Sequence, residues 1–235
     1  MNKMIKFGLI AIAVTGISTA KAEEANEYEA IGWTPFAIGV WSPVQIPWGS
    51  HTWDVFGMNI GLLWTDAPKM YGIDVTGLAS ATRDDFIGLK VSGLCNWNTK
   101  DVYGVRATLG ANIAFGETYG VDMGSFSYRE GDFWGLDVNL IGSYSKIMNG
   151  VQVSGIVNLA SEMSYGCTVA VGGSMAKKAY GLQLAGVFNF TDELHGCQIG
   201  LVNFARECPW GFQIGLVNII MDNSIKVLPI VNCYF

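Results

Sequence analysis

A tandem repeat of 15 or 16 residues is the feature that most constrains how this chain folds. Its clearest copies open at Gly181, Gly196 and Gly211 and read Gly-Leu-Gln-Leu-Ala-Gly-Val-Phe-Asn, Gly-Cys-Gln-Ile-Gly-Leu-Val-Asn and Gly-Phe-Gln-Ile-Gly-Leu-Val-Asn. Spacing this regular predicts a repeat architecture and leaves no room for a separate domain among the repeats. The eleven units open at Gly57, Gly72, Gly88, Gly104, Gly120, Gly135, Gly150, Gly166, Gly181, Gly196 and Gly211.

Within a unit, apolar and polar residues alternate with a period of two, which is typical of a β-strand. If the opening glycine is position one, positions two and four are apolar and position three is usually polar, as in Val105-Arg106-Ala107. Each unit is predicted to be one strand of about nine to eleven residues followed by a tight turn, so the chain is all-β. The candidate lumen lining at position three comprises Asp74, Lys90, Arg106, Asp122, Asp137, Gln183, Gln198 and Gln213.

The residue before the opening glycine is aromatic in eight of the eleven units. It shares the side-chain parity of the apolar positions, so each predicted strand carries an aromatic ring at one end of its apolar face. Rings at the ends of lipid-facing strands form belts at membrane interfaces. The candidate aromatic belt comprises Tyr71, Tyr103, Tyr119, Trp134, Tyr165, Tyr180 and Trp210.

Two architectures would use this pattern. The first is an antiparallel up-and-down β-barrel of about 12 strands, with apolar positions facing lipid and polar positions facing the interior. The second is a β-solenoid in which each unit is one coil, the apolar face points inward, and Asn189, Asn203 and Asn218 stack as a ladder at a turn.

The order of charges favours the barrel. In a parallel solenoid, position three of one unit lies about 4.8 Å from position three of the next. Lys90 would then lie on Arg106, and Asp122 on Asp137. Like charges directly opposed on neighbouring strands are destabilising. We therefore predict the barrel and keep the solenoid as the alternative.

Residues 1–22 have the features of a secretory signal peptide. Two lysines near the start precede a short apolar run over residues 7–14, and Ala20-Lys21-Ala22 fits a small-x-small cleavage site. The apolar run is too short to span a membrane as a helix. We predict export to the outer membrane or cell surface, or, for the solenoid, to the periplasm or the medium.

The remaining chain divides into an acidic segment, residues 23–32, and a single β-repeat domain, residues 33–235. Without the three lysines of the signal, 11 basic side chains remain against 20 acidic ones. Nucleic acid is therefore excluded as a predicted partner, because binding phosphates requires a basic face. Membrane lipid is the predicted partner, and a protein partner or small solute is left open.

Residues suited to catalysis are sparse. Of the two histidines, His195 belongs to the column before the glycines, and His51 lies close to Ser50 and Asp54. Three such groups within one short loop rarely reach the geometry of a nucleophilic triad. The cysteines lack metal-ligand spacing, and the glycines form no phosphate-binding loop before a helix.

We therefore predict no enzyme and no catalytic, cofactor or metal site. The predicted function is that of a surface or outer-membrane barrel with a structural or weakly pore-forming role. The alternative is a soluble exported β-repeat protein that binds or interacts with a partner.

The three clearest units, together with the lead-in at residues 41–46 and the closing segment at 228–232, resemble a poorly characterised group of bacterial surface-repeat proteins. That group carries tandem Gly-Leu-Gln-x-Gly-Leu-Val-Asn units. The likeness covers most of residues 36–235, although the units between 57 and 179 depart from the consensus. The resemblance implies a surface or outer-membrane setting and carries no activity and no site residues.

Overall fold

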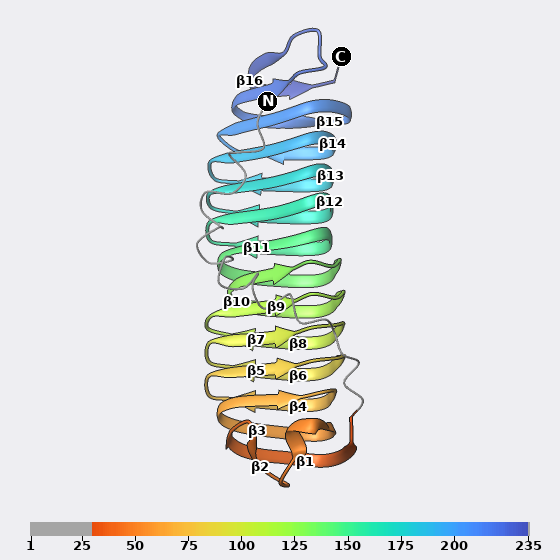
Figure 1. The fold of residues 1–235 in the computed structure, drawn as a ribbon. Coiled ribbons are helices and arrows are strands. Elements are labelled where there is room, and N and C mark those ends of the chain that lie inside the picture. Colours follow the sequence, from red (N-terminus) through yellow and green to blue (C-terminus); the bar gives the residue numbers. More distant parts are fainter. Residues whose placement is uncertain (1–29, 235) are drawn as a thin grey trace, which may run out of the picture.

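The repeats form a parallel β-solenoid (Figure 1) in a computed structural model that describes residues 30–234. The predicted signal peptide lies outside the described residues, as does most of the acidic segment. Each unit is one coil, and equivalent residues of successive coils pair in parallel, as Gly120 does with Gly135. The predicted antiparallel barrel is therefore wrong, and the solenoid that we kept as the alternative is the fold.

Strands make up the coils, joined along one sheet from end to end. A single 3-10 turn, η2 (Ser50–Thr52), precedes the first full coil. The strands are β1 (Gly32–Trp41), β2 (Val44–Ile46), β3 (Trp53–Ala67), β4 (Met70–Thr76), β5 (Ala79–Thr82), β6 (Phe86–Ser92), β7 (Cys95–Asn98), β8 (Val102–Thr108), β9 (Ala111–Ala114), β10 (Thr118–Arg129), β11 (Phe133–Ser154), β12 (Val157–Ala170), β13 (Gly173–Ala185), β14 (Phe188–Ile199), β15 (Val202–Ile220) and β16 (Val227–Cys233).

Every coil has a first segment, which begins near the opening glycine, and a second segment that runs back beside it. In the early coils the two segments are separate strands, such as β6 and β7. A bend between the segments forms what we call the leucine edge, and the return to the next coil forms what we call the charged edge. The charged edge includes Lys69, Arg83, Asp84, Lys100, Asp101, Glu117, Glu130, Asp132, Lys146, Glu162, Lys178, Asp192 and Arg206. The leucine edge consists of Leu62, Leu78, Leu94, Leu109, Leu140, Ile156, Val171, Val187, Leu201 and Leu216.

Stacking of the coils explains why each unit opens with glycine. The opening glycines have φ between 114° and 152°, a conformation that residues with a side chain rarely adopt. A Cβ atom on Gly135 would also lie 1.8 Å from the carbonyl oxygen of Gly120 in the preceding coil. Any other residue would therefore push two coils apart.

The side chains are arranged inversely to those of a water-soluble solenoid. Asp74 is fully buried, whereas its neighbours Ile73 and Val75 are 40% and 42% exposed. The inward apolar face that we predicted for a solenoid is therefore wrong. A further interior column, in the second segments, contains only Ser, Thr and Asn, all at most 1% exposed: Thr65, Ser80, Asn96, Asn112, Ser127, Ser143, Asn158, Ser174, Asn189, Asn203 and Asn218.

Apolar residues enter the interior mainly behind the charged edge. Two clusters contain Phe86 and Met70 in the early coils, and Phe133, Met148 and Leu194 in the later ones. The interior is thus polar behind the apolar faces, and its apolar side chains lie behind the charged edge together with polar ones such as Thr82 and Asn98.

Both ends of the described solenoid are covered by strands that interrupt the parallel stacking. At the start, β2 pairs antiparallel with β1, and at the end β16 pairs antiparallel with β15. Pro43 and Pro47 flank β2, and Pro229 lies within β16. Proline cannot donate a ladder hydrogen bond, so these ends resist the addition of further strands.

Candidate functional site: an inverted core and an apolar perimeter

The residues at position three form one column inside the solenoid. From Asn59 in the first coil to Gln213 in the last, each is at most 2% exposed. Side chains of the second segments pack against the column, so a filled interior takes the place of the predicted barrel lumen. The eight residues predicted to line that lumen all lie in this column: Asp74, Lys90, Arg106, Asp122, Asp137, Gln183, Gln198 and Gln213.

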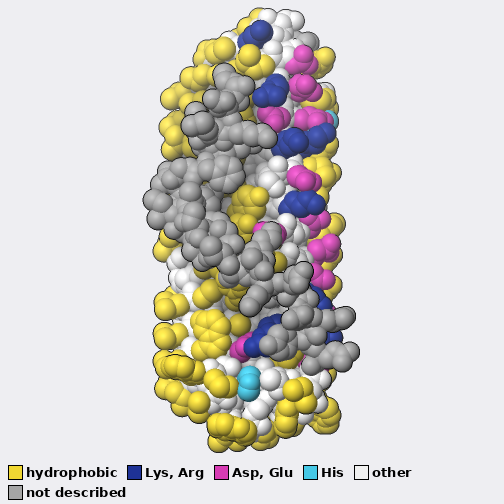
Figure 2. All heavy atoms as spheres, viewed as in Figure 1, with side chains coloured by type: hydrophobic (Ala, Val, Ile, Leu, Met, Phe, Trp, Pro, Cys, Tyr) yellow, Lys and Arg dark blue, Asp and Glu magenta, His cyan; other side chains and the backbone are white. Residues whose placement is uncertain are grey.

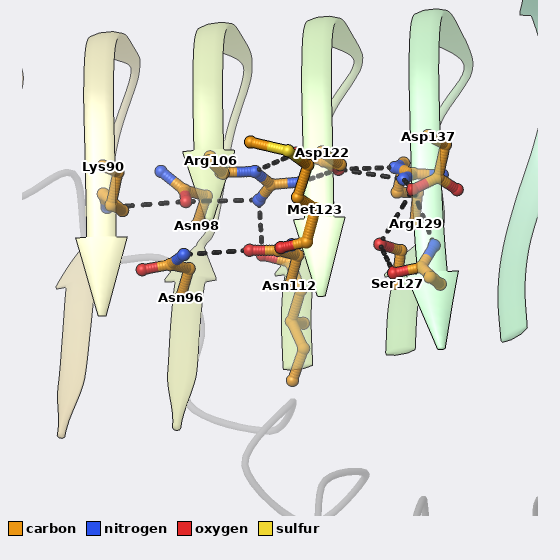
Figure 3. Close-up of polar contacts among 12 residues, drawn as sticks. Lys90, Asn96, Asn98, Arg106, Asn112, Asp122, Met123, Ser127, Arg129 and Asp137 are labelled. Carbon is orange, nitrogen blue, oxygen red and sulfur yellow. Dashed lines mark hydrogen bonds and ion pairs between the residues drawn. The ribbon is translucent and has the colours of Figure 1, made fainter. Parts of the chain in front are cut away.

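A buried ionic network occupies the middle of this column (Figure 3). Arg106 donates two hydrogen bonds to the Asp122 carboxylate, from Nε at 2.8 Å and from NH2 at 2.6 Å. Arg129 enters from a second segment, and its NH2 atom lies 2.9 Å from Asp122 Oδ2 and 2.8 Å from Asp137 Oδ1. The guanidinium of Arg129 therefore bridges two carboxylates that lie in register on adjacent coils.

At the cationic end of the network, buried oxygen atoms likewise offset the repulsion between stacked like charges. Lys90 and Arg106 are in register on adjacent coils, as the solenoid alternative required. The Lys90 ammonium donates to Thr82 Oγ1 at 2.6 Å and lies 4.0 Å from Asp74 Oδ2. The side-chain oxygen of Asn98 accepts from both Lys90, at 3.5 Å, and Arg106, at 3.4 Å. With Arg129 included, three buried cations balance three buried carboxylates.

The two ends of the network differ in how firmly they are ionised. Burial raises the pKa of Asp74 despite the attraction of Lys90, and burial lowers the pKa of Lys90 to about 8. Burial also acts against ionisation of Asp122, but Arg106 and Arg129 together hold its pKa below the usual value. The bidentate pair is thus the firmly charged part of the network.

Amide ladders occupy the later coils. Gln198 donates to Gln183 Oε1, and Gln213 donates to Gln198 Oε1, both at 2.8 Å. Asn203 accepts from Asn189 and donates to Asn218, also at 2.8 Å. The asparagine ladder predicted for a solenoid is present, and it lies inside the coil. Because an amide is both donor and acceptor, identical residues satisfy one another from coil to coil.

The predicted aromatic belt lies on the outer surface as a single column beside the charged edge. Its rings stack on one another, with centroids 5.1 Å apart for Tyr103 and Tyr119 and 4.7 Å apart for Tyr165 and Tyr180. Their faces are therefore covered and their edges point outward, which does not suit a platform for sugar rings. In this column lie Tyr71, Tyr103, Tyr119, Trp134, Tyr165, Tyr180 and Trp210.

Polar tips of this column point toward the charged edge. The Tyr119 hydroxyl donates to the Glu117 carboxylate, and this hydrogen bond raises the pKa of Tyr119 to about 12. His195 Nε2 lies 2.7 Å from Glu193 Oε1. Rings with an apolar body and a polar tip are typical of a boundary between water and an apolar phase.

A second, interrupted aromatic stripe borders the charged edge on the opposite face. It contains Trp97, Tyr128, Tyr144, Phe190 and Phe204, and the aliphatic residues Leu159 and Met175 lie between its two stacked pairs. Tyr128 stacks on Tyr144 with centroids 5.2 Å apart, and Phe190 stacks on Phe204 at 4.8 Å. Sequence reasoning missed this stripe, and it also missed Arg129, which lies beside a turn. The sequence pattern that could have indicated both is an outward aromatic residue between two inward small or polar residues, as in Ser127-Tyr128-Arg129.

Between the two stripes, the perimeter is apolar on both faces and around the leucine edge. Residues of the leucine edge are between 44% and 81% exposed. Figure 2 shows Lys, Arg, Asp and Glu gathered along one side of the rod. Exposed apolar patches of this extent are rare on water-soluble monomers and mark contact with lipid or another protein.

Backbone groups at the leucine edge are hydrogen-bonded between coils. Leu94 N donates to Leu78 O at 2.7 Å, and Val217 N donates to Leu201 O at 3.0 Å. Pairing of this kind allows a backbone to enter hydrocarbon, where an unsatisfied group costs several kcal/mol.

The depth of the apolar perimeter is close to that of one lipid leaflet. Six residues separate Trp134 beside the charged edge from Leu140 on the leucine edge, a distance of at most about 20 Å. On the other face, four residues separate Leu140 from Tyr144, about 13 Å. The hydrocarbon of one leaflet is about 15 Å thick, half of the bilayer core.

Other kinds of site have little support among residues 30–234. In that range, no group of three or more His, Cys, Asp or Glu side chains is placed to hold a metal ion. Ser50 donates to Gln45 Oε1 at 3.1 Å, and Asp54 accepts from Lys69 N at 3.2 Å, so both engage groups other than His51. The described residues also form no helix that is long and apolar enough to cross a membrane.

Comparison with known proteins adds no relative. No protein-family model matches the chain, and neither a curated protein nor a solved structure matches it.

Proposed function

We propose that this chain is an exported structural protein that lies lengthwise in one leaflet of a membrane. Its apolar faces and leucine edge contact lipid, and its charged edge faces water. The observation that carries the proposal is the inversion of the coil, with polar residues inside and an apolar perimeter bounded by two aromatic stripes. Lipid-facing β-structures distribute their side chains in the same way.

The distribution of polar and apolar side chains in the coil supports a lipid environment. The main driving force for folding in water is removal of apolar surface from solvent. Here most coils bury Gln, Asn, Ser, Thr and charged side chains and leave the larger aliphatic ones outside. Moving one leucine-edge side chain fully out of water is worth about 1.5–3 kcal/mol. The leucine edge repeats that gain along the rod.

The aromatic stripes and the depth of the perimeter support a fixed position in the leaflet. With the stripes at the headgroup level, the leucine edge reaches the region of the bilayer midplane. Tyr and Trp concentrate at such interfaces because one end of each ring is apolar and the other is polar. Export to an outer membrane or cell surface follows from the signal read in residues 1–22 and from the resemblance to surface-repeat proteins.

A soluble exported interaction protein is the second candidate. The terminal strands β2 and β16 favour it, because solenoids that function in water need capped ends. In that case another protein would cover the apolar faces.

Vesicle flotation tests the proposal. The variant Leu94→Glu/Leu109→Glu/Leu140→Glu places three carboxylates on the leucine edge, where the native side chains are exposed and contribute little to coil packing. We expect the unmodified protein to float with vesicles and this variant to remain in the dense fraction. The matched control, Lys69→Glu/Lys100→Glu/Lys146→Glu, changes the charged edge and should still float.

Circular dichroism of all three proteins is used to check that the β-structure persists. Flotation of the leucine-edge variant at the unmodified level would contradict lipid contact. A detergent-free, monodisperse protein that does not float would support the interaction protein instead.

A further inference from the structure

Three of the five cysteines share one column on the outer surface. Cys167, Cys197 and Cys233 occupy position two, or its equivalent in β16, on the face that the first segments form, which we call the first-segment face. Leu182 separates the first two thiols along this column, and Phe212 separates the last two. All three thiols are free and partly exposed. The column therefore carries thiols at equal intervals of two strands.

These thiols cannot pair within one chain. Two strand spacings place their Cα atoms about 9.6 Å apart, and a disulfide requires about 7 Å or less. Cys208 is buried inside the coil, and Cys95 lies on the opposite face, in a second segment. In an exported protein, exposed thiols of this kind pair between chains.

Equal spacing makes the column symmetric about Cys197. A two-fold axis at this level, running from the charged edge to the leucine edge, reverses the direction of a second rod and keeps its charged edge on the same side. Cys197 then lies opposite Cys197 of the second copy, and Cys167 lies opposite its Cys233. We propose that two copies of this chain form an antiparallel dimer through their first-segment faces, closed by these disulfides. The inference rests on the export in the proposed function, because disulfides persist in oxidising compartments.

The surface around Cys197 suits such a contact. A groove of about 810 Å³ lies there, and Gly181, Gly196 and Trp210 are among the residues that line it. The Trp210 side chain is 73% exposed. The two-fold axis places Trp210 of the second copy opposite Tyr180, where the groove runs over Gly181. A protruding ring of each copy thus meets a hollow in the other.

The charges beside the column agree with this register. Lys178, Glu193 and Glu207 lie in register on successive coils at the charged edge. The two-fold axis sets Lys178 opposite Glu207 of the second copy, which is an attractive pair. The two Glu193 carboxylates meet near the axis, and each is offset by Lys178 of its own chain at 2.6 Å.

The contact is small, so the disulfides determine whether it persists. The five strands from Cys167 to Cys233 overlap over about 24 Å, and the face is at most about 20 Å deep. The buried area is therefore about 1,000 Å² in total, at the lower limit for a specific interface. Sheets that pack about 10 Å apart can be bridged, as in the inter-sheet disulfide of antibody domains. The earlier coils of each rod keep their contact with lipid.

Bond formation requires an oxidant of the disulfide class, for which oxidised glutathione serves in the assay. A Cys197 thiolate attacks the glutathione disulfide and displaces one glutathione thiolate. Cys197 of the second copy then displaces the other, so two protein thiols become one disulfide and two glutathione thiols form. Burial raises the pKa of Cys167 and of Cys197, so the exchange is run at mildly alkaline pH.

Single-thiol variants test the register. The buried Cys208 is kept in all of them, and every other cysteine except the one under test is replaced by alanine. We expect disulfide-linked dimer on non-reducing gels from the protein that keeps Cys197. Protein that keeps Cys167 alone or Cys233 alone should give little dimer, and an equal mixture of the two should give several-fold more. Protein that keeps Cys95, on the opposite face, is the matched control and should give little.

The outcomes separate this inference from lipid contact. Cross-linking is done in detergent micelles and in vesicles, and circular dichroism checks that each variant folds. Absence of the Cys197 dimer, or equal dimer from the Cys95 control, overturns the inference. Self-linking of the Cys167 protein at the level of the mixture overturns the antiparallel register. Loss of flotation by the reduced protein, with normal cross-linking, overturns lipid contact and leaves the dimer.

Discussion

The solenoid has two halves with the same perimeter and different interiors. In the ionic half, residues 57–149, charged side chains at position three are balanced through Arg129 from a second segment. In the amide half, residues 150–220, Gln and Asn ladders join the last three coils, and Thr168 and Ser174 interrupt the two columns before them. Both halves carry apolar residues at positions two and four and an aromatic stripe beside the charged edge.

This difference shows in which part of the coil the residue type is constrained. The perimeter keeps its apolar character throughout, whereas the interior holds two different polar sets. In an amide ladder, each side chain donates a hydrogen bond to the identical side chain of a neighbouring coil. An ionic column needs partners from several coils, so a single substitution there leaves a buried charge uncompensated.

The largest effect is expected for Arg129→Met in the ionic half. The variant leaves Asp137 without its guanidinium partner and Asp122 with only Arg106. Breaking a buried ion pair on one side costs about 3–5 kcal/mol. Unfolding by denaturant in detergent measures this loss in the free energy of unfolding.

The control is Arg206→Met, which removes a side chain that is 64% exposed and 3.4 Å from Asp192. It should change the free energy of unfolding by less than about 1 kcal/mol. Equal effects of the two substitutions would contradict a charge-balanced core.

A pH dependence that arises from Lys90 in the ionic half is expected next. The folded-state pKa of Lys90 is lowered to about 8 from 10.5 by burial. Between these values the unfolded chain holds a proton that the folded chain has released, so stability rises with pH across this window. The rise is at most about 3 kcal/mol, at 1.36 kcal/mol per unit.

Unfolding is measured at pH 8 and at pH 10 for the unmodified protein and for Lys90→Met, and the difference between the two gives this slope. The comparison removes the opposite contribution of Cys208, whose pKa burial raises to about 11 in both proteins. A slope that survives in Lys90→Met would assign the effect to another group.

A smaller effect is expected for Gln198→Leu in the amide half. The substitution removes the central member of the ladder, leaving Gln183 Oε1 and Gln213 Nε2 each without one partner. A buried neutral group left unsatisfied costs about 1–3 kcal/mol. The same denaturant assay applies. A cost above that of Arg129→Met would contradict the contrast between the halves.

The smallest effect is expected on the perimeter, and it should be equal in both halves. Leu94 and Leu201 occupy equivalent places on the leucine edge and are 59% and 48% exposed. Replacing either by Ser should weaken partition into vesicles by about 1 kcal/mol, with little change in the core. A strong effect in one half only would show that the rod does not lie flat in the leaflet.

Much of the fold could be predicted from sequence, because the alternation and the repeat are local patterns. The all-β character, the polar column at position three and the aromatic column are where the pattern placed them. The single strand of nine to eleven residues predicted for each unit is wrong, because each unit contains two segments, such as β6 and β7. The choice of barrel was wrong because the charge argument compared only neighbours within one column. It did not include Arg129 and Asn98, which enter from the second segments and relieve the stacked like charges.

The direction of the faces could not be read from the alternation. A period of two separates polar from apolar residues but does not say which set faces inward. The opening glycines would have been informative, because their spacing puts one directly on another only in a parallel stack. The second aromatic stripe was missed because its rings lie in short segments between turns.

Spin labels report the orientation of the rod in lipid. In a variant whose five cysteines are replaced by alanine, a single cysteine is introduced by Leu140→Cys or by Lys146→Cys. We predict that the label at 140 is accessible to oxygen dissolved in hydrocarbon and shielded from a water-soluble nickel chelate, and that the label at 146 shows the reverse. Equal access of the chelate to both labels would contradict the account.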